Sequence, residues 1–383
     1  MPKNDKQILE GSRAIALTVK NISPAVVSAY PITPQTHIVE DLAKFKADGK
    51  ADYEYIRAES EFAAASIVLG ASATGVRTYS ATSSQGLLLM AEVVFNISGM
   101  RLPVVMTCAN RSISAPINIW NDHSDVMSVR DAAWIQLFAA DIQEAVDSHV
   151  LAYKLAEKLR LPVMVNVDGF ILTHSYEPVK IPSPELIKKY LPDYRPGKGY
   201  LNPEKPITMG GFFTPTHYLE TRRDLHEDLI GSRKTIKEEY DSLQKIFGRR
   251  NRSSRLDNGL MEYYGSAKPE TIVVALGSVI GTIREAAKNH KKLGILKIKT
   301  YRPFPAEEIA GILKKAKNIA VIEKALSYGA TGPLYSDIAA VLPDGSNLKN
   351  YIVGLGGRDV TEKMIINIIK DAAKKGERLK FIC

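Results

Sequence analysis

The sequence predicts an α/β protein with two parallel-sheet domains, and three observations lead to this fold class. Short apolar runs alternate with longer helix-like segments through the first 170 residues, and the same rhythm returns near residue 271. These runs are continuously apolar, which is typical of parallel strands that are buried on both faces. A chain of 383 residues is also longer than one hydrophobic core ordinarily supports.

In the first unit, each expected strand is a short apolar run such as AVVSAY, PVVMTC or PVMVNV. Each expected helix is a longer segment between two such runs. Strands are expected over residues 25–30, 76–81, 103–108, 134–139 and 162–167, and helices over residues 11–19, 35–47, 61–74, 85–97 and 142–159.

The alternation stops from about Asp168 to Asn258, where several prolines are followed by a charged helical pattern over residues 219–247. A second α/β unit then begins, and it is long enough for a complete small domain. In that unit, strands are expected over residues 271–276, 295–299, 319–322 and 351–354, and helices over residues 282–292, 306–316, 332–341 and 361–375. The sequence therefore predicts a first domain with its connecting segment over residues 1–245, a linker over 246–264, and a second domain over 265–383.

The composition is that of a folded protein without a membrane span, with 45% hydrophobic and 24% charged residues. No apolar run approaches the roughly 18 residues that a span requires. The first residues lack the apolar core of a signal peptide, so a cytoplasmic location is expected. Cys108 and Cys383 are the two cysteines of the chain, which fits a reducing compartment and excludes a self-contained cluster with four cysteine ligands.

A formal charge of +9 raises the question of polyanionic partners. The basic residues are spread along the chain, and their densest group is GRRNRSSR at residues 248–255. No aromatic residues interleave with this group, as they would on a surface that binds single-stranded nucleic acid. A solvated linker is therefore the favoured interpretation, and an anionic partner protein stays open.

The segment IRAESEFAAA at residues 56–65 places two carboxylates beside a run of small residues. Ser60 can cap the helix that follows, and Glu61 in its first turn suits the positive end of the helix dipole. The alanines, serines and glycines of residues 63–75 allow another backbone to approach closely, so this helix is expected to be buried. A buried carboxylate at its start requires a partner, either from the protein or from a ligand.

Three further polar segments follow apolar strands, at the sheet edge where open α/β folds bind ligands. In YPITPQT, two prolines stiffen the loop and fix the direction of the Thr33 hydroxyl, although a plain rigid turn explains the segment equally well. The segment TSSQG at residues 82–86 can hold a polar ligand or simply cap a helix. Arg111 can grip a carboxylate in bidentate fashion or form a structural ion pair.

Two other patterns are weaker indications of chemistry. In WNDHSD at residues 120–125, one histidine and two aspartates make a thin metal site, and no G-x-S-x-G elbow accompanies them. A hydrogen-bonded loop near the ligand is the better interpretation. The segments GSVIG and GLGGRD, at residues 277–281 and 354–359, match a dinucleotide fingerprint only in part, so tight backbone turns are favoured over nicotinamide binding.

Taken together, several segments carry a resemblance that no single one carries alone: YPITPQT, ESEFAAA, TSSQGLLLM, SGMRLPVVM, NRSISAPINIWNDHSD, DGFILTH, RPFP and GLGGRD. They resemble the alpha subunit of the multi-subunit 2-oxoacid:ferredoxin oxidoreductases, most closely the pyruvate type (pyruvate synthase), from about Gly11 to the last residue. The resemblance implies a thiamine-diphosphate pyrimidine-binding parallel-sheet domain followed by a transketolase C-terminal-like α/β domain. These are the two α/β units already expected from the strands and helices.

The resemblance also implies roles for individual residues. In that family, the glutamate before the small-residue helix hydrogen-bonds a ring nitrogen of the cofactor's pyrimidine and stabilises the imino tautomer. This catalytic and cofactor-binding role corresponds to Glu61, whereas Glu59 is expected outside the site. Thr33 corresponds to a substrate-contacting threonine, and Arg111 to the arginine that binds the 2-oxoacid carboxylate. Pro31, Ser84 and Gln85 are expected to bind the cofactor.

Several cofactors and partners are implied that this chain does not itself hold. The sequence has no G-D-G…N-N run to hold the diphosphate of thiamine diphosphate through Mg²⁺, so the cofactor is expected to be shared with a beta-type subunit. The 4Fe-4S clusters are expected on a delta-type subunit, and a gamma-type subunit completes the complex. No metal ligand, nucleic acid or membrane partner is expected for this chain.

The expected activity is the reversible oxidative decarboxylation of pyruvate with coenzyme A, giving acetyl-CoA, CO₂ and reduced ferredoxin, with partner subunits required. One alternative is the alpha subunit of the 2-ketoisovalerate (branched-chain) enzyme, because pocket size and not chemistry separates the two. Another is a non-catalytic scaffold of the same fold, against which the retained Thr33, Glu61 and Arg111 argue. The sequence leaves open the physiological direction, the stoichiometry and the subunit that binds coenzyme A.

Overall fold

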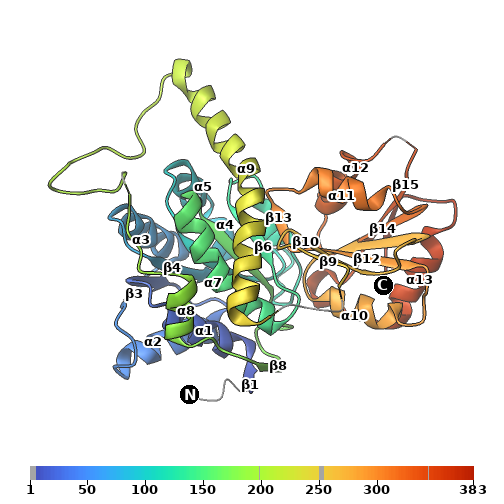
Figure 1. Ribbon diagram of the computed structural model, residues 1–383, viewed down its shortest axis with the longest axis horizontal. Helices are drawn as coiled ribbons and strands as arrows, with labels where there is room; N and C mark the ends of the chain where they lie inside the picture. Colours follow the sequence, from blue (N-terminus) through green and yellow to red (C-terminus); the bar gives the residue numbers. More distant parts are fainter. Residues whose placement is uncertain (1–5, 198, 250–253, 344) are drawn as a thin grey trace.

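The computed structural model describes residues 6–197, 199–249, 254–343 and 345–383. Two seven-stranded sheets, each with helices packed against it, lie side by side (Figure 1). This arrangement confirms the predicted α/β class with parallel sheets. Residues 250–253 of the basic segment lie outside the described residues, so the interpretation of that segment as a solvated linker stays a prediction. Within the described ranges, no helix is long and apolar enough to cross a membrane.

The first sheet has the strand order β13-β6-β7-β5-β4-β2-β3, and all its strands except β13 run parallel. The carboxyl ends of its parallel strands therefore meet along one edge. The strand β3 was not expected from the sequence because it lies at the sheet edge and is mostly exposed, so it has no continuous apolar run. The strands are β2 (Val26–Ala29), β3 (Glu54–Arg57), β4 (Thr78–Thr82), β5 (Val105–Asn110), β6 (Ile135–Phe138) and β7 (Val163–Asp168).

The helices of this unit form two packed groups. One group contains α1, α2 and α7, and the other contains α3, α4 and α5. The helix expected over residues 85–97 is two helices that meet at Met90. The bounds are α1 (Gly11–Ile22), α2 (Thr36–Ala47), α3 (Glu61–Ala73), α4 (Ser84–Leu89), α5 (Ala91–Gly99), α6 (Ser124–Ser128) and α7 (Ile142–Leu159).

The connecting segment begins with β8 (Tyr176–Val179), which pairs antiparallel with β1 (Gln7–Glu10), and continues through α8 (Pro184–Tyr190). The chain then contacts the first unit at Leu201, whose backbone N–H donates to the Ala73 carbonyl at 2.7 Å. After a loop that projects outward, α9 (Pro215–Phe247) returns the chain across α7 (Figure 1). The predicted charged helix is therefore present, and it is longer than expected.

The second sheet has the order β16-β15-β14-β11-β12-β10-β9, and β10 runs antiparallel to both of its neighbours, β12 and β9. These two strands lie at the end of the segment 246–264 that we expected to be linker, so the domain boundaries stay a prediction. The strands are β9 (Leu256–Asp257), β10 (Met261–Gly265), β11 (Thr271–Ala275), β12 (Leu293–Ile298), β14 (Asn318–Glu323), β15 (Asn347–Ile352) and β16 (Leu379–Phe381). The helices are α10 (Val279–Ala287), α11 (Ala306–Leu313), α12 (Pro333–Ala339), the 3-10 helix η1 (Leu355–Gly357) and α13 (Glu362–Ala372).

One strand links the two units. β13 (Thr300–Arg302) directly follows β12 in the chain, yet it pairs antiparallel with β6 at the edge of the first sheet. The second unit thus completes the sheet of the first. This pairing fixes the two sheets relative to each other and brings the loops of both units to a shared junction.

Candidate active site

The predicted site residues lie where parallel strands of the first sheet end. Thr33 follows β2, Ser84 and Gln85 follow β4, and Arg111 follows β5. Glu61 begins α3, which packs against β2 and β4. The parallel topology therefore brings together segments that are far apart in the sequence.

Glu61 is held at the start of α3 by local capping. The Ser60 hydroxyl accepts a hydrogen bond of 3.1 Å from the backbone N–H of Ala63, as the predicted N-cap requires. Glu61 is only 8% exposed, whereas Glu59 is exposed. Within the described part of the chain, the Glu61 carboxylate makes no hydrogen bond or ion pair. A buried carboxylate in this state is poised to accept a hydrogen bond from a ligand.

Gly86 in α4 gives the Glu61 carboxylate its space. A Cβ atom at Gly86 would lie 2.8 Å from Oε1 of Glu61 and 2.6 Å from Oγ1 of Thr82. Two buried polar atoms beside this glycine, Oγ1 of Thr82 and Nε2 of Gln85, have no hydrogen-bond partner among the described residues. Polar groups that lack hydrogen-bond partners among the described residues therefore surround Gly86. The TSSQG motif was the sole indication of them in the sequence.

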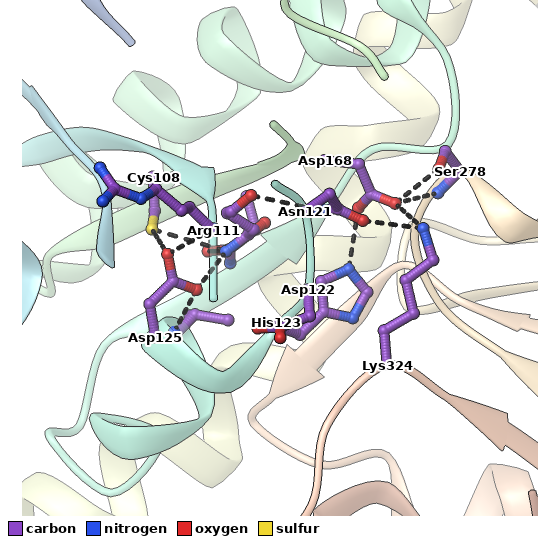
Figure 2. Close-up of polar contacts among 12 residues, drawn as sticks. Cys108, Arg111, Asn121, Asp122, His123, Asp125, Asp168, Ser278 and Lys324 are labelled. Atoms are coloured by element: carbon purple, nitrogen blue, oxygen red, sulfur yellow. Dashed lines mark hydrogen bonds and ion pairs between the residues drawn. The ribbon is translucent and has the colours of Figure 1, made fainter. Parts of the chain in front are cut away.

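Asp125 at the start of α6 organises the loops after β4 and β5 (Figure 2). Its carboxylate accepts hydrogen bonds from the backbone N–H groups of Ser84 at 3.0 Å and Arg111 at 2.9 Å, and from Nδ2 of Asn110 at 3.1 Å. Burial raises its pKa to about 6. The expected hydrogen-bonded loop is thus present, but the central role of Asp125 was missed, because its partners are distant in the sequence.

Arg111 and Thr33 are brought together, and the contact runs through the backbone of Thr33. Nη1 of Arg111 donates to the carbonyl of Thr33 at 2.9 Å, and Nε donates to the carbonyl of Asn118 at 3.0 Å. No carboxylate among the described residues forms an ion pair with this buried guanidinium. The structure therefore does not support the alternative that Arg111 forms a structural ion pair. Burial lowers the pKa of Arg111.

The other predicted residues differ in what they can offer to a ligand. Pro31 and Thr33 lie in an exposed part of the loop after β2. Ser84 is fully buried, and its hydroxyl lies 2.5 Å from both the Ser112 carbonyl and Oε1 of Gln85. The polar groups of Ser84 are therefore engaged within the protein, whereas Nε2 of Gln85 has no hydrogen-bond partner in the described ranges.

A second buried network joins the two units at Asp168, the last residue of β7 (Figure 2). Its carboxylate contacts Nε2 of His123 at 2.8 Å, Oγ of Ser278 at 2.5 Å and Nζ of Lys324 at 3.0 Å. These neighbours, above all the Lys324 ammonium, hold the pKa of Asp168 well below its usual range against the opposing effect of burial. The network fastens the loops after β11 and β14 onto the first sheet, and the sequence did not reveal it.

Two family sequence profiles match the chain. The profile described as "Pyruvate flavodoxin/ferredoxin oxidoreductase, thiamine diP-bdg" matches residues 18–241, which hold the predicted site residues. The profile described as "Pyruvate:ferredoxin oxidoreductase core domain II" matches residues 269–365. The chain belongs to the pyruvate:ferredoxin oxidoreductase family. The resemblance to the alpha subunit of this family, inferred from the sequence motifs, is thereby confirmed.

Curated members of the family are similar over nearly the whole chain. "Pyruvate synthase subunit PorA" of Methanocaldococcus jannaschii is 46% identical over 375 residues, covering 96% of this chain and 95% of that protein. The subunit of the same name from Pyrococcus abyssi is 44% identical and covers 97% and 95%. "Ketoisovalerate oxidoreductase subunit VorA" of Pyrococcus furiosus is 39% identical and covers 96% and 94%.

A solved structure shares the fold. It is the 2-oxoglutarate:ferredoxin oxidoreductase of Magnetococcus marinus, with 2-oxoglutarate, coenzyme A and succinyl-CoA bound. The TM-score is 0.73 at 22% identity, and the match covers 97% of this chain and 66% of that one. This likeness supports the fold assignment of both units.

Proposed function

We propose that this chain supplies the pyrimidine-binding half of a thiamine-diphosphate site in a multi-subunit pyruvate:ferredoxin oxidoreductase. The complex converts pyruvate and coenzyme A into acetyl-CoA and CO₂ and reduces ferredoxin. The observation that carries the proposal is the buried Glu61 carboxylate, which has no partner in the described chain and faces the space that Gly86 leaves open. The family profile over residues 18–241 and the relatives named pyruvate synthase subunits support it.

The residues around Gly86 fit the aminopyrimidine ring of thiamine diphosphate. A carboxylate that accepts from a ring nitrogen matches Glu61, and the unpartnered Nε2 of Gln85 and Oγ1 of Thr82 add polar contacts beside it. When bound, the cofactor supplies an acidic thiazolium carbon and an electron sink for decarboxylation. The Glu61 carboxylate would share a proton with the pyrimidine ring nitrogen, and the burial of Glu61 keeps water from competing for that hydrogen bond.

Arg111 is the proposed holder of the substrate carboxylate. A guanidinium has five N–H donors, and the bonds to the Thr33 and Asn118 carbonyls engage only Nε and Nη1. Because these partners are neutral carbonyls, the positive charge of Arg111 stays available to a 2-oxoacid. Asp125 holds the backbone of Arg111 in place, so the position of the cation depends on a buried hydrogen bond.

The open side of the site fits a partner subunit. Apolar side chains near the start of α3 and on α4 and α5 are partly exposed: Phe62 at 40%, Leu89 at 52% and Phe95 at 41%. We assign this surface to a beta-type subunit that binds the diphosphate through Mg²⁺. Delta-type and gamma-type subunits carry the 4Fe-4S clusters and complete the complex, and ferredoxin accepts the electrons.

Pyruvate is favoured over branched-chain 2-oxoacids as the substrate. The relatives named pyruvate synthase subunits reach 46% identity, whereas the relative named ketoisovalerate oxidoreductase subunit is 39% identical. Comparison of kcat/KM for pyruvate and 2-ketoisovalerate on the reconstituted complex decides between them. A higher value for 2-ketoisovalerate would reassign the substrate and leave the chemistry unchanged.

The decisive experiment on the site is Glu61→Gln in the reconstituted complex, assayed with pyruvate, coenzyme A and ferredoxin. We expect the complex to assemble and turnover to fall about 10²–10⁴-fold, because the amide cannot take up the shared proton. Glu59→Gln is the matched control. Glu59 is exposed and directly precedes the cap residue Ser60, so this variant should keep wild-type turnover. Wild-type rates in Glu61→Gln would remove Glu61 from the mechanism.

A further inference from the structure

Three residues outside the proposed reaction site bring metal-binding groups together. They are Glu10 at the end of β1, His37 in the first turn of α2, and His174 in the turn after β7. One candidate ligand atom from each residue lies within 4.8 Å of those of the other two. The sequence did not indicate this cluster, because its members are far apart in the chain.

His37 contacts both other members of the cluster. Nδ1 of His37 is 2.7 Å from Oε1 of Glu10, which by itself is a common surface pair. The ring of His174, however, packs against His37 with 4.7 Å between the centroids. Burial and the neighbouring His37 ring lower the pKa of His174, which favours the neutral imidazole.

The orientation of His174 is fixed by its surroundings. Nδ1 lies 2.7 Å from Oγ1 of Thr173, and that oxygen accepts a hydrogen bond of 2.8 Å from the backbone N–H of Phe170. The Phe170 ring stacks on His174 at 4.7 Å. Nε2 has no hydrogen-bond partner among the described residues, and its lone pair is available to a metal ion in the tautomer in which Nδ1–H donates to Thr173. A metal-binding histidine is typically held in this way, through its other ring nitrogen.

We propose that Glu10, His37 and His174 bind a divalent transition-metal ion of the Zn²⁺ type. Two imidazole nitrogens and one carboxylate oxygen form a donor set that such ions prefer, and water completes the tetrahedron. In a tetrahedral zinc site with bonds of about 2.0–2.1 Å, the ligand atoms lie roughly 3.4 Å apart. The three candidate ligand atoms, all within 4.8 Å of one another, are close to this spacing.

The ion would clamp three segments that already touch. Backbone hydrogen bonds join Gly11 to Ser175 at 3.1 Å and Ser12 to Thr173 at 2.9 Å. α2, which carries His37, begins directly after the loop that holds Thr33. A bound ion therefore stabilises the base of the proposed substrate loop without contacting the reacting groups.

The test uses the full-length chain, freed of metal with a chelator and then titrated with Zn²⁺ or Co²⁺ alone. We expect one equivalent of ion to survive dialysis, a rise in Tm, and a Co²⁺ absorption spectrum typical of mixed nitrogen and oxygen ligands. His37→Ala, His174→Ala and Glu10→Gln should each weaken binding at least about tenfold and abolish the rise in Tm. His217→Ala, at an exposed histidine of α9, is the matched control and should bind like wild type.

Two results would overturn the proposal. The wild-type chain could retain no stoichiometric ion, or the three variants could bind as tightly as wild type. Unfolding curves without metal show whether each variant is folded, and Glu10→Gln replaces a side chain by one of the same shape should a histidine variant fail to fold. Because the measurement is metal content, its outcome is independent of turnover and of the role of Glu61.

Discussion

Gly86→Ala tests the proposed site by filling the space beside Glu61 with a single methyl group. The new Cβ would lie 2.8 Å from Oε1 and 2.9 Å from Cγ of Glu61, and 2.6 Å from Oγ1 of Thr82. All three neighbours are side-chain atoms, so the backbones of α3 and α4 can stay where they are. Both side chains have to move, and the Glu61 carboxylate is displaced because the methyl meets two of its side-chain atoms, Oε1 and Cγ.

The expected effects on stability and on turnover differ widely. Overpacking costs about 1–3 kcal/mol, and the higher helix propensity of alanine offsets about 1 kcal/mol of this, which leaves a net loss of about 0–2 kcal/mol. Ordinary contact lies near 3.5 Å, so Oε1 must retreat by about 0.7 Å. A displacement of this size at a catalytic group costs about 10²-fold in rate.

The assay is steady-state turnover of the reconstituted complex, together with urea unfolding of the full-length chain. Gly231→Ala in α9 is the control, because a Cβ there meets nothing within 4 Å, and it should gain about 0.5–1 kcal/mol at unchanged turnover. If Gly86→Ala acts through Glu61, the double variant with Glu61→Gln is no slower than Glu61→Gln alone. Multiplicative losses, or wild-type turnover in Gly86→Ala, would refute the reasoning.

Three other outcomes follow from buried ionisable side chains. Asp125→Asn should cost about 2–4 kcal/mol in urea unfolding, because its amide N–H₂ meets N–H donors that the carboxylate now satisfies. Lys324→Met should cost about 3–5 kcal/mol, since it leaves Asp168 buried without its main cation, and adding Asp168→Asn should restore part of the loss. Burial lowers the pKa of His149 from 6.5 to about 4, so below pH 6.5 the unfolded chain takes up a proton that the folded chain cannot. Wild type should lose up to about 3 kcal/mol between pH 6.5 and 4 in pH-dependent unfolding, and His149→Gln should lack this part of the slope.

The sequence was sufficient for features that depend on neighbouring residues. Local residues predicted the cap at Ser60, the start of α3 at Glu61 and the small residues after it. From these features we also predicted a buried carboxylate that requires a hydrogen-bond partner. The apolar runs predicted the parallel strands, because burial on both faces leaves an unbroken apolar signature. The edge strands β3 and β9 escaped prediction for the same reason, since exposed strands carry no such signature.

The chain alone therefore determined its fold class, its family and the acid that begins α3, since each is recorded in contiguous residues. Tertiary structure alone decided how the site is supported. Asp125 joins the ends of β4 and β5, Asp168 meets Lys324 across the two units, and β13 completes a sheet that begins more than a hundred residues earlier. Glu10, His37 and His174 meet in the same way. Such contacts depend on which strands lie side by side. The packing of both units against each other sets the strand order, and no short stretch of sequence records it.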